Sequence, residues 1–245
     1  MKKVLVVGGS EDYVGAVYLA AISALRAGAV SVIVMAPKKV AWVLNTLSPD
    51  LMTRKLKGPY LSTSHYGTIK KLLESADILL IGNGAGTLRQ TMSLMRLLLR
   101  WPGLKVIDAD ALKALRGTSI KNAILTPNED EWKTLQKNSD IRKLLENNVI
   151  IQKGRRTRVL SANKTYQQKR TNPGLEKAGM GDVLAGTCAG YLAQGLTPRH
   201  AAKKAADIGN TIADILTKKK RGYYFLASDI ANELSNLTHR AGFRS

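Results

Sequence analysis

The sequence predicts an α/β fold in which helices cover both faces of a mostly parallel sheet. Two observations lead to this prediction. Short runs of Val, Ile and Leu alternate along the 245-residue chain with longer amphipathic segments. These runs are apolar throughout, as in strands that are buried on both sides. No Pro- or Ser-rich linker and no repeat interrupts the pattern, so we expect one domain over residues 1–237 and a flexible tail over 238–245.

The predicted strands are short apolar runs that end at Gly, Pro or polar residues. They are Val4–Val7, Ser31–Met35, Ile78–Ile81, Lys105–Ile107, Ala123–Leu125, Val149–Gln152 and Arg158–Leu160. The predicted helices have apolar residues spaced three and four apart. They are Val14–Ala27, Lys38–Leu47, Tyr66–Leu73, Leu88–Leu99, Asp110–Leu115, Glu129–Gln136, Ile141–Asn147, Gly181–Gln194, Pro198–Leu216 and Ala227–Asn236. Because ligands of such folds bind beyond the carboxyl ends of the strands, we expect site residues in the segments that follow them.

The composition excludes several classes of protein. A net charge of +20 raises the question of nucleic-acid binding, but the basic residues are dispersed and only 5% of residues are aromatic. We therefore do not expect a nucleic-acid partner, and an anionic nucleotide suits the charge equally well. No run approaches the ~18–20 apolar residues of a membrane span. The single cysteine, Cys188, cannot form an internal disulfide, so we expect a cytoplasmic protein.

The most informative segment is the glycine-rich turn before the helix predicted from Gly181. Gly179, Met180 and Gly181 precede Asp182, and an apolar helix of small residues follows. Such a turn leaves backbone N–H groups free at a helix N-terminus, where an anion such as phosphate binds. A carboxylate beside that anion would repel it, so Asp182 is better suited to take a proton from an attacking hydroxyl. The alternative is that Asp182 is a helix cap in a glycine-rich loop.

Two further glycine-rich segments follow predicted strands. They are Gly8–Ala16 and Gly82–Thr87, whose glycines let the backbone approach a ligand. The second contains G-x-G-x-G but not the full dinucleotide-binding fingerprint, which argues against a Rossmann dehydrogenase. No G-x-x-x-x-G-K-[ST] is present, so this is not a P-loop protein.

Three polar segments allow two interpretations each. Asp108 and Asp110 either hold Mg²⁺ through water, or Asp110 caps the next helix. Asn128 and Glu131, three residues apart, either orient a hydrated Mg²⁺ and a phosphate or form a capping box. The segment Lys153–Thr157 either contacts a nucleotide or is an ordinary basic hairpin.

Taken in order, these segments resemble the ribokinase-like superfamily, and more closely the ADP- or ATP-dependent NAD(P)H-hydrate dehydratases, a carbohydrate-kinase-like domain often fused to an epimerase. The matching motifs are Gly8–Ala16, Leu25–Ala29, Ile81–Gly86, Asp108–Leu112, Leu125–Pro127, Lys153–Thr157, Asn172–Leu175, Gly181–Gly186 and Leu226–Asp229. The resemblance implies a three-layer α/β/α sandwich around a central mostly parallel sheet. Since the sequence begins at the first strand of this domain, no epimerase domain is expected before it.

The resemblance also implies a reaction. A nicotinamide cofactor hydrated on its ring, NAD(P)HX, is dehydrated to NAD(P)H by phosphorylation of the added hydroxyl and elimination of phosphate, with Mg²⁺ and with ADP or ATP as the consumed nucleotide. Asp182 is then the base. The implied nucleotide-binding residues are Lys153, Gly154, Arg155, Arg156, Thr157, Gly179, Met180 and Gly181. The implied substrate-binding residues are Ala16, Gly86, Asn128 and Asp182, with Glu131 near the metal. A homo-oligomer is implied, with a tetramer favoured, and the helices Val14–Ala27 and Gly181–Gln194 are candidate interfaces.

Two segments of four residues depart from the family pattern. Asn128-Glu-Asp-Glu131 stands where His-Pro-Gly-Glu is usual, and Ala178-Gly-Met-Gly181 stands where Gly-Gly-Ser/Thr-Gly is usual. Asn-x-x-Glu is typical of related sugar and vitamin kinases. The alternative is therefore a kinase that phosphorylates a hydroxymethyl group of a vitamin precursor or sugar. A third interpretation is a nucleic-acid-binding protein whose fold derives from an enzyme that has lost its activity. It predicts that binding to DNA or RNA weakens steeply with salt.

Overall fold

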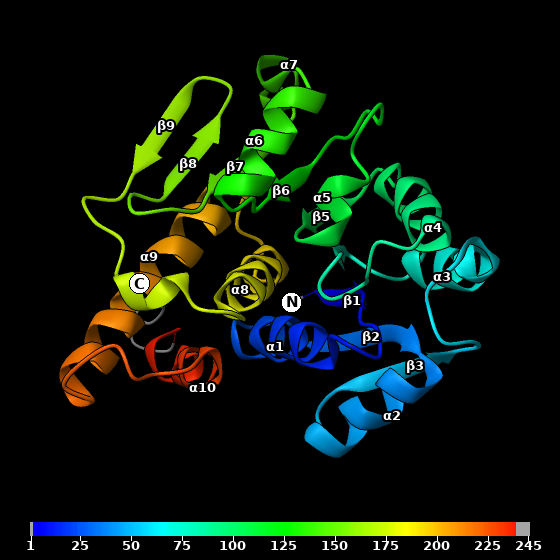
Figure 1. Cartoon of the computed structure of the whole chain (residues 1–245), viewed down its shortest axis with the longest axis horizontal. Coiled ribbons are helices and arrows are strands. Elements are labelled where there is room, and N and C mark those ends of the chain that lie inside the picture. Colours follow the sequence, from blue (N-terminus) through cyan, green and yellow to red (C-terminus); the bar gives the residue numbers. More distant parts are fainter. Residues whose placement is uncertain (1, 239–245) are drawn as a thin grey trace.

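A nine-stranded sheet forms the centre of the molecule, with the strands in the order β3-β2-β1-β4-β5-β6-β7-β8-β9 (Figure 1). The computed structural model describes residues 2–238. The strands are β1 Lys3–Val7, β2 Ser31–Pro37, β3 Met52–Leu56, β4 Ile78–Ile81, β5 Leu104–Ile107, β6 Ala123–Leu125, β7 Asn148–Gln152, β8 Arg158–Ser161 and β9 Lys164–Gln167. Neighbours from β3 to β7 pair in parallel, while β8 and β9 pair antiparallel. The predicted α/β class with a mostly parallel sheet is confirmed.

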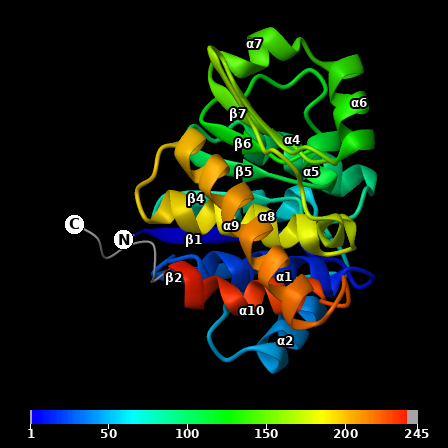
Figure 2. The ribbon, with the colours of Figure 1, turned by 90° about the vertical axis from the view of Figure 1, so that its left-hand side faces the viewer.

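The helices form a layer on each face of the sheet. They are α1 Val14–Arg26, α2 Lys38–Leu47, α3 Tyr66–Leu73, α4 Arg89–Leu99, α5 Asp110–Lys113, α6 Glu129–Asn138, α7 Ile141–Leu145, α8 Met180–Ala193, α9 Pro198–Lys219 and α10 Ala227–Thr238. Residues of α1, α2, α8 and α9 share one core cluster, and residues of α3 to α6 share the other. In the view of Figure 2, α9 crosses α8, which lies over the sheet.

Strand β1 shows why the sequences of the central strands are continuous apolar runs. Val4 and Val6 belong to the core cluster on one face of the sheet, and Leu5 and Val7 belong to the cluster on the other face. Both sets are almost fully buried because helices cover both faces. Each predicted helix is present, with its ends shifted by at most three residues. Thr238 is the last residue of α10, and the rest of the predicted tail, 239–245, lies outside the described residues.

Both edges of the sheet were missed by sequence analysis. The edge strand β3 has the sequence Met-Thr-Arg-Lys-Leu, and the opposite edge strand β9 has Lys-Thr-Tyr-Gln. Neither has an apolar run, because edge strands are partly solvated and charged side chains there hinder pairing with other chains. Two short 3₁₀ segments, Thr63–His65 and Pro173–Glu176, were also not predicted.

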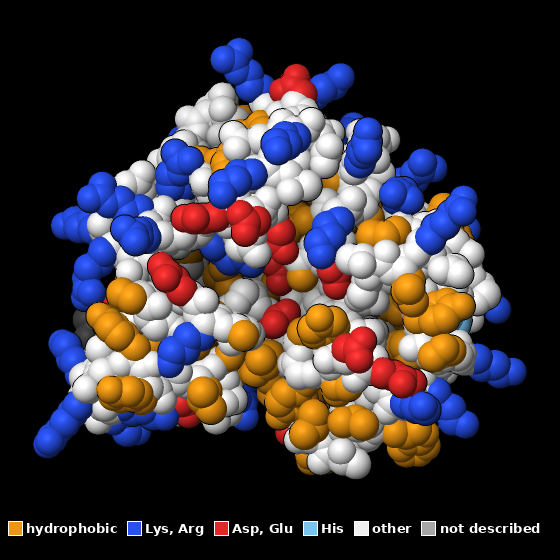
Figure 3. Space-filling model, in the orientation of Figure 1, with side chains coloured by type: hydrophobic (Ala, Val, Ile, Leu, Met, Phe, Trp, Pro, Cys, Tyr) orange, Lys and Arg blue, Asp and Glu red, His pale blue; other side chains and the backbone are white. Residues whose placement is uncertain are grey.

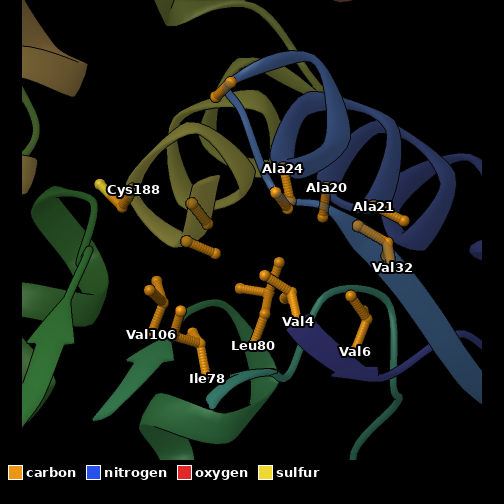
Figure 4. Packing of buried hydrophobic residues seen from close by; sticks show 14 of the residues in the cluster. Val4, Val6, Ala20, Ala21, Ala24, Val32, Ile78, Leu80, Val106 and Cys188 are labelled. Carbon is orange, nitrogen blue, oxygen red and sulfur yellow. The ribbon is translucent and has the colours of Figure 1, made fainter. Parts of the chain in front are cut away.

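Glycines let α1 and α8 approach each other closely. A Cβ atom on Gly186 would lie 2.1 Å from the carbonyl oxygen of Ala20, and one on Gly190 would lie 2.6 Å from that of Ala24. Figure 4 shows Ala20 and Ala24 on the side of α1 that meets α8. Because α8 is buried over most of its length, it cannot supply the oligomer interface predicted for it. Among the described residues, no helix has the length and hydropathy needed to cross a membrane.

Gly186→Ala is expected to destabilise the fold by about 2–3 kcal/mol, because the new methyl group meets backbone that cannot rotate away. The measurement is the free energy of unfolding in urea. Gly67→Ala, on the exposed start of α3 where a Cβ meets no atom within 4 Å, is the matched control and is expected to be neutral or slightly stabilising. An equal effect of both substitutions would contradict this account of the contact.

Candidate active site

A cavity of about 670 Å³ opens where β5, β6 and β7 end and α8 begins. Figure 3 shows this face hollowed near its centre, with acidic side chains around the hollow and basic ones at its periphery. The lining residues are Asp108, Ala109, 128–131, Lys153, Gly154, Arg155, Thr157, Gln168, Thr171, 175–184, Thr187, Ala205, Ala206, Gly209, Ile230 and Leu234. The cavity therefore lies at the carboxyl ends of the strands, as the fold class predicts.

The N-terminus of α8 carries unpaired backbone donors into this cavity. Gly179 has a left-handed φ of 83°, which turns the chain into the helix at Met180. No described residue accepts a hydrogen bond from the N–H groups of Gly181 or Asp182. A Cβ atom on Gly181 would lie 2.8 Å from Nζ of Lys153, so the ammonium group stands over the same turn. Two N–H groups, the helix dipole and an ammonium together make a site for an anion such as phosphate.

Asp182 lies in the first turn of α8, half-buried beside these donors. Its Oδ1 accepts a hydrogen bond of 2.7 Å from Nδ2 of Asn83. The pKa of Asp182 is raised to about 7, mainly by burial and also by the nearby charge of Asp108, while Asn83 and Lys153 oppose the rise. A carboxylate with a pKa near neutrality is suited to accept a proton during catalysis.

Asp108, at the end of β5, is almost fully buried, and three donors bind its carboxylate. They are Oγ1 of Thr126 at 2.5 Å, Nδ2 of Asn83 at 2.9 Å and Nζ of Lys153 at 3.2 Å. These contacts engage both oxygens of Asp108 and link it to Thr126, Asn83 and Lys153. In the described part of the chain, no three acidic, Cys or His side chains are grouped to hold a metal ion.

For Asp110, the interpretation as a helix cap is wrong. Its Oδ2 accepts the N–H of Gly86 at 2.9 Å, and its Oδ1 pairs with Nζ of Lys113 at 2.8 Å. It does not cap α5, whose cap position is Ala109. Ala109 has a φ of 49°, a strained conformation for a residue with a Cβ, and it separates two carboxylates with different partners.

Asn128 and Glu131 form the capping box of α6. Oδ1 of Asn128 accepts the N–H of Glu131 at 2.9 Å, and Oε2 of Glu131 accepts the N–H of Asn128 at 2.8 Å. The capping interpretation is therefore confirmed, and both residues also line the cavity. Burial is the main cause that raises the pKa of Glu131, and the N–H of Asn128 and Lys153 oppose it.

Most of the predicted site residues meet at the cavity, and three do not. Arg156 is exposed outside it, and Ala16 and Gly86 are also absent from its lining. Ala16 packs against the Gly82–Gly86 loop, because its Cβ is 3.1 Å from where a Cβ of Gly84 would stand. That loop also carries Asn83, which contacts Asp182. Met180 lines the cavity, but its side chain packs in the core cluster that contains Phe225.

Sequence analysis missed Asn83 and Thr126. Thr126 directly follows one predicted strand, and Asn83 is the second residue after another. Positions just after a strand are where ligand-binding residues are expected in this fold. The sequence alone does not show that β4, β5 and β6 lie side by side in this order, and that adjacency is what brings Asn83 and Thr126 to Asp108.

Comparison with known proteins shows the family of the chain. A family model described as NAD(P)H-hydrate dehydratase matches residues 4–236. The bifunctional NAD(P)H-hydrate repair enzyme Nnr of Pyrobaculum aerophilum is 34% identical over 99% of this chain and 52% of its own length. The ADP-dependent (S)-NAD(P)H-hydrate dehydratase of Nitrosopumilus maritimus is 31% identical over 96% of this chain and 87% of its own length. The chain thus spans about half the length of the bifunctional relatives that it matches.

The fold is also similar to those of solved structures. The ADP/ATP-dependent NAD(P)H-hydrate dehydratase of Bacillus subtilis, co-crystallised with ATP/Mg²⁺, superposes with a TM-score of 0.81 at 22% identity, over 98% of this chain and 92% of that one. Phosphofructokinase-2 of Escherichia coli superposes with a TM-score of 0.61 at 13% identity, over 98% of this chain and all of that one, which places the sheet and helices in the ribokinase-like architecture. The match to the family model covers nearly the whole chain, and the chain belongs to the NAD(P)H-hydrate dehydratase family.

Proposed function

We propose that this chain dehydrates NAD(P)HX to NAD(P)H while consuming ADP or ATP. The observation that carries the proposal is the position of Asp182, a carboxylate with a pKa raised to about 7, beside the unpaired N–H groups of α8 and the ammonium of Lys153. A base next to an anion site is the arrangement that transfer of a phosphoryl group to a hydroxyl requires. Membership of the family supplies the substrate class.

In the proposed reaction, Asp182 takes the proton of the ring hydroxyl while the hydroxyl oxygen attacks the terminal phosphorus of the nucleotide. The bond between that phosphorus and the leaving nucleotide oxygen breaks, and the Gly181 and Asp182 N–H groups with Lys153 stabilise the developing charge. The C–O bond of the phosphorylated ring then breaks, and phosphate and a ring proton leave to give NAD(P)H.

The nucleotide is proposed to occupy the cavity between α8 and the β7–β8 turn. Lys153, Gly154, Arg155, Thr157 and the Gly179–Gly181 turn are the proposed contacts, since all of them line it. Mg²⁺ bound to nucleotide phosphates needs only one or two protein carboxylates, and it neutralises the phosphate charge during transfer. Glu131 fits this role through water, because among the residues that the structure describes only Asn128 engages its carboxylate, through an N–H bond to Oε2. Asn128 and the Gly86 loop are proposed to face the hydrated ring.

The name of the Nitrosopumilus maritimus relative favours ADP over ATP as the consumed nucleotide, and the name of the Bacillus subtilis protein allows both. We also propose a cytoplasmic location on the basis of the lone, buried and free Cys188. A homo-oligomer, with a tetramer favoured, remains a prediction.

The test is the near-ultraviolet absorbance of reduced nicotinamide in a mixture of NADHX, Mg²⁺ and either ADP or ATP. We expect absorbance to rise only when a nucleotide is present, with free phosphate released in equal amount. The rate should increase with pH through about 7 as Asp182 loses its proton. A stable phosphorylated product without NADH would instead establish a kinase. Nucleotide binding with neither product would refute the proposal.

A further inference from the structure

Asn83 joins the two carboxylates of the site with a single amide group. It follows β4, its side chain is fully buried, and its Nδ2 donates to Oδ1 of Asp182 at 2.7 Å and to Oδ2 of Asp108 at 2.9 Å. The two N–H bonds of one NH₂ group are thereby used for two acids on different elements. The opposite orientation of the amide would place its oxygen against two carboxylate oxygens, so the contacts fix the assignment.

The two oxygens of Asn83 differ in their surroundings. Oδ1 of Asn83 is buried and accepts no hydrogen bond from any residue that the structure describes. A buried carbonyl oxygen without a donor destabilises a folded chain. The backbone is also held tightly, because the carbonyl oxygen of Asn83 accepts the N–H of Gly9 at 2.9 Å and would lie 2.5 Å from a Cβ of Gly8. The chain therefore holds this amide rigidly, with its donors directed at Asp108 and Asp182.

We propose that Asn83 is a positioning residue that holds the Asp182 carboxylate in place and in its ionised form beside Asp108. The role as a positioning residue for catalysis rests on the proposed function, in which Asp182 is the base. The charged groups that face Asp182 are Asp108 after β5 and Glu131 on α6, which disfavour its negative charge, and Lys153 after β7, which favours it. Asn83 adds a neutral donor that favours the ionised form of Asp182 without adding charge.

The experiment compares Asn83→Leu with the unmodified chain by two measurements. The first follows the ¹³C chemical shift of the Asp182 carboxyl group with pH in the nucleotide-free protein, assigned with Asp182→Asn. The second is the pH profile of kcat/KM for NADH formation. We expect both midpoints to rise by about one pH unit, so that the rate at pH 7 falls about five-fold and largely recovers by pH 9. Because Asn83 does not line the cavity, ADP affinity should stay within about two-fold.

Asn148→Leu is the matched control. Asn148 is also a buried amide, but it lies at the start of β7, where it bonds to Ile120, Leu144 and Ala123. Its replacement should lower the thermal unfolding midpoint and leave the titration of Asp182 unchanged. If Asn83→Leu does not fold, Asn83→Ser provides the same test, because one hydroxyl proton cannot serve two carboxylates.

The outcomes separate this inference from the proposed function. An unchanged Asp182 midpoint in Asn83→Leu, with activity lost equally at every pH, overturns the positioning role. A shifted midpoint in a protein that never forms NADH supports the contact and refutes the proposed function instead. In an Asp182→Asn background, Asn83→Leu should change the remaining rate by less than about two-fold, since Asn83 acts through Asp182.

Discussion

Replacement of Asp182 with Asn is expected to lower kcat for NADH formation by about 10²–10⁴-fold, because an amide cannot accept the hydroxyl proton. The substitution keeps the shape of the side chain and an oxygen that accepts from Asn83. The N–H groups of α8 and Lys153 also stay in place, so ADP affinity measured by calorimetry should change little. A variant that retained more than a tenth of the turnover would show that Asp182 is not the base.

The same variant should gain stability at higher pH. Because the pKa of Asp182 is raised to about 7 in the folded chain, its contribution to stability is fully present below its ordinary pKa and is lost as pH rises through 7. Asp182→Asn removes this loss. Its free energy of unfolding should exceed that of the unmodified protein at pH 8 by on the order of 1–2 kcal/mol, with partial solvent exposure taken into account. The two proteins should converge towards pH 4.

Lys153→Met is expected to weaken ADP binding about 100-fold and to destabilise the chain by about 2 kcal/mol. Nζ of Lys153 lies 3.2 Å from the buried carboxylate of Asp108 and stands over Gly181 at the anion site. Its loss leaves Asp108 charged and buried with only Thr126 and Asn83 as donors. Calorimetry with ADP and Mg²⁺ measures the affinity, and urea unfolding measures the stability.

Lys133→Met is the control for this prediction. Lys133 also pairs with an aspartate at 3.2 Å, Asp130, but both side chains are largely exposed on α6. An exposed pair contributes little, so the change in unfolding free energy should be below about 0.5 kcal/mol, with unaltered ADP affinity. If ADP bound Lys153→Met as tightly as it binds the unmodified chain, the nucleotide would have to lie elsewhere.

The features predicted from the sequence were those encoded locally. The buried strands and the amphipathic helices each have their own apolar pattern, and Asp182 was found because its glycine-rich turn is contiguous with it. The edge strands β3 and β9 have no such pattern. Asp110 and Asn83 were not understood because their partners, Gly86 for one and Asp108 and Asp182 for the other, are at least 24 residues away. Their roles depend on which loops the sheet order makes adjacent.

Within residues 2–238, the residues that line the cavity all come from Asp108 onward, whereas the glycine-rich loops after β1 and β4 come from the first part of the chain. Asn83 connects these two parts at Asp182. In the proposed function, all contacts to the nucleotide come from the later part of the chain, whereas the Gly86 loop, one of the proposed contacts to the hydrated ring, comes from the first part. Under this proposal, substitutions around Gly86 change the fit of the hydroxyl-bearing molecule while the nucleotide contacts stay unchanged, so that one scaffold can accept different hydroxyl compounds.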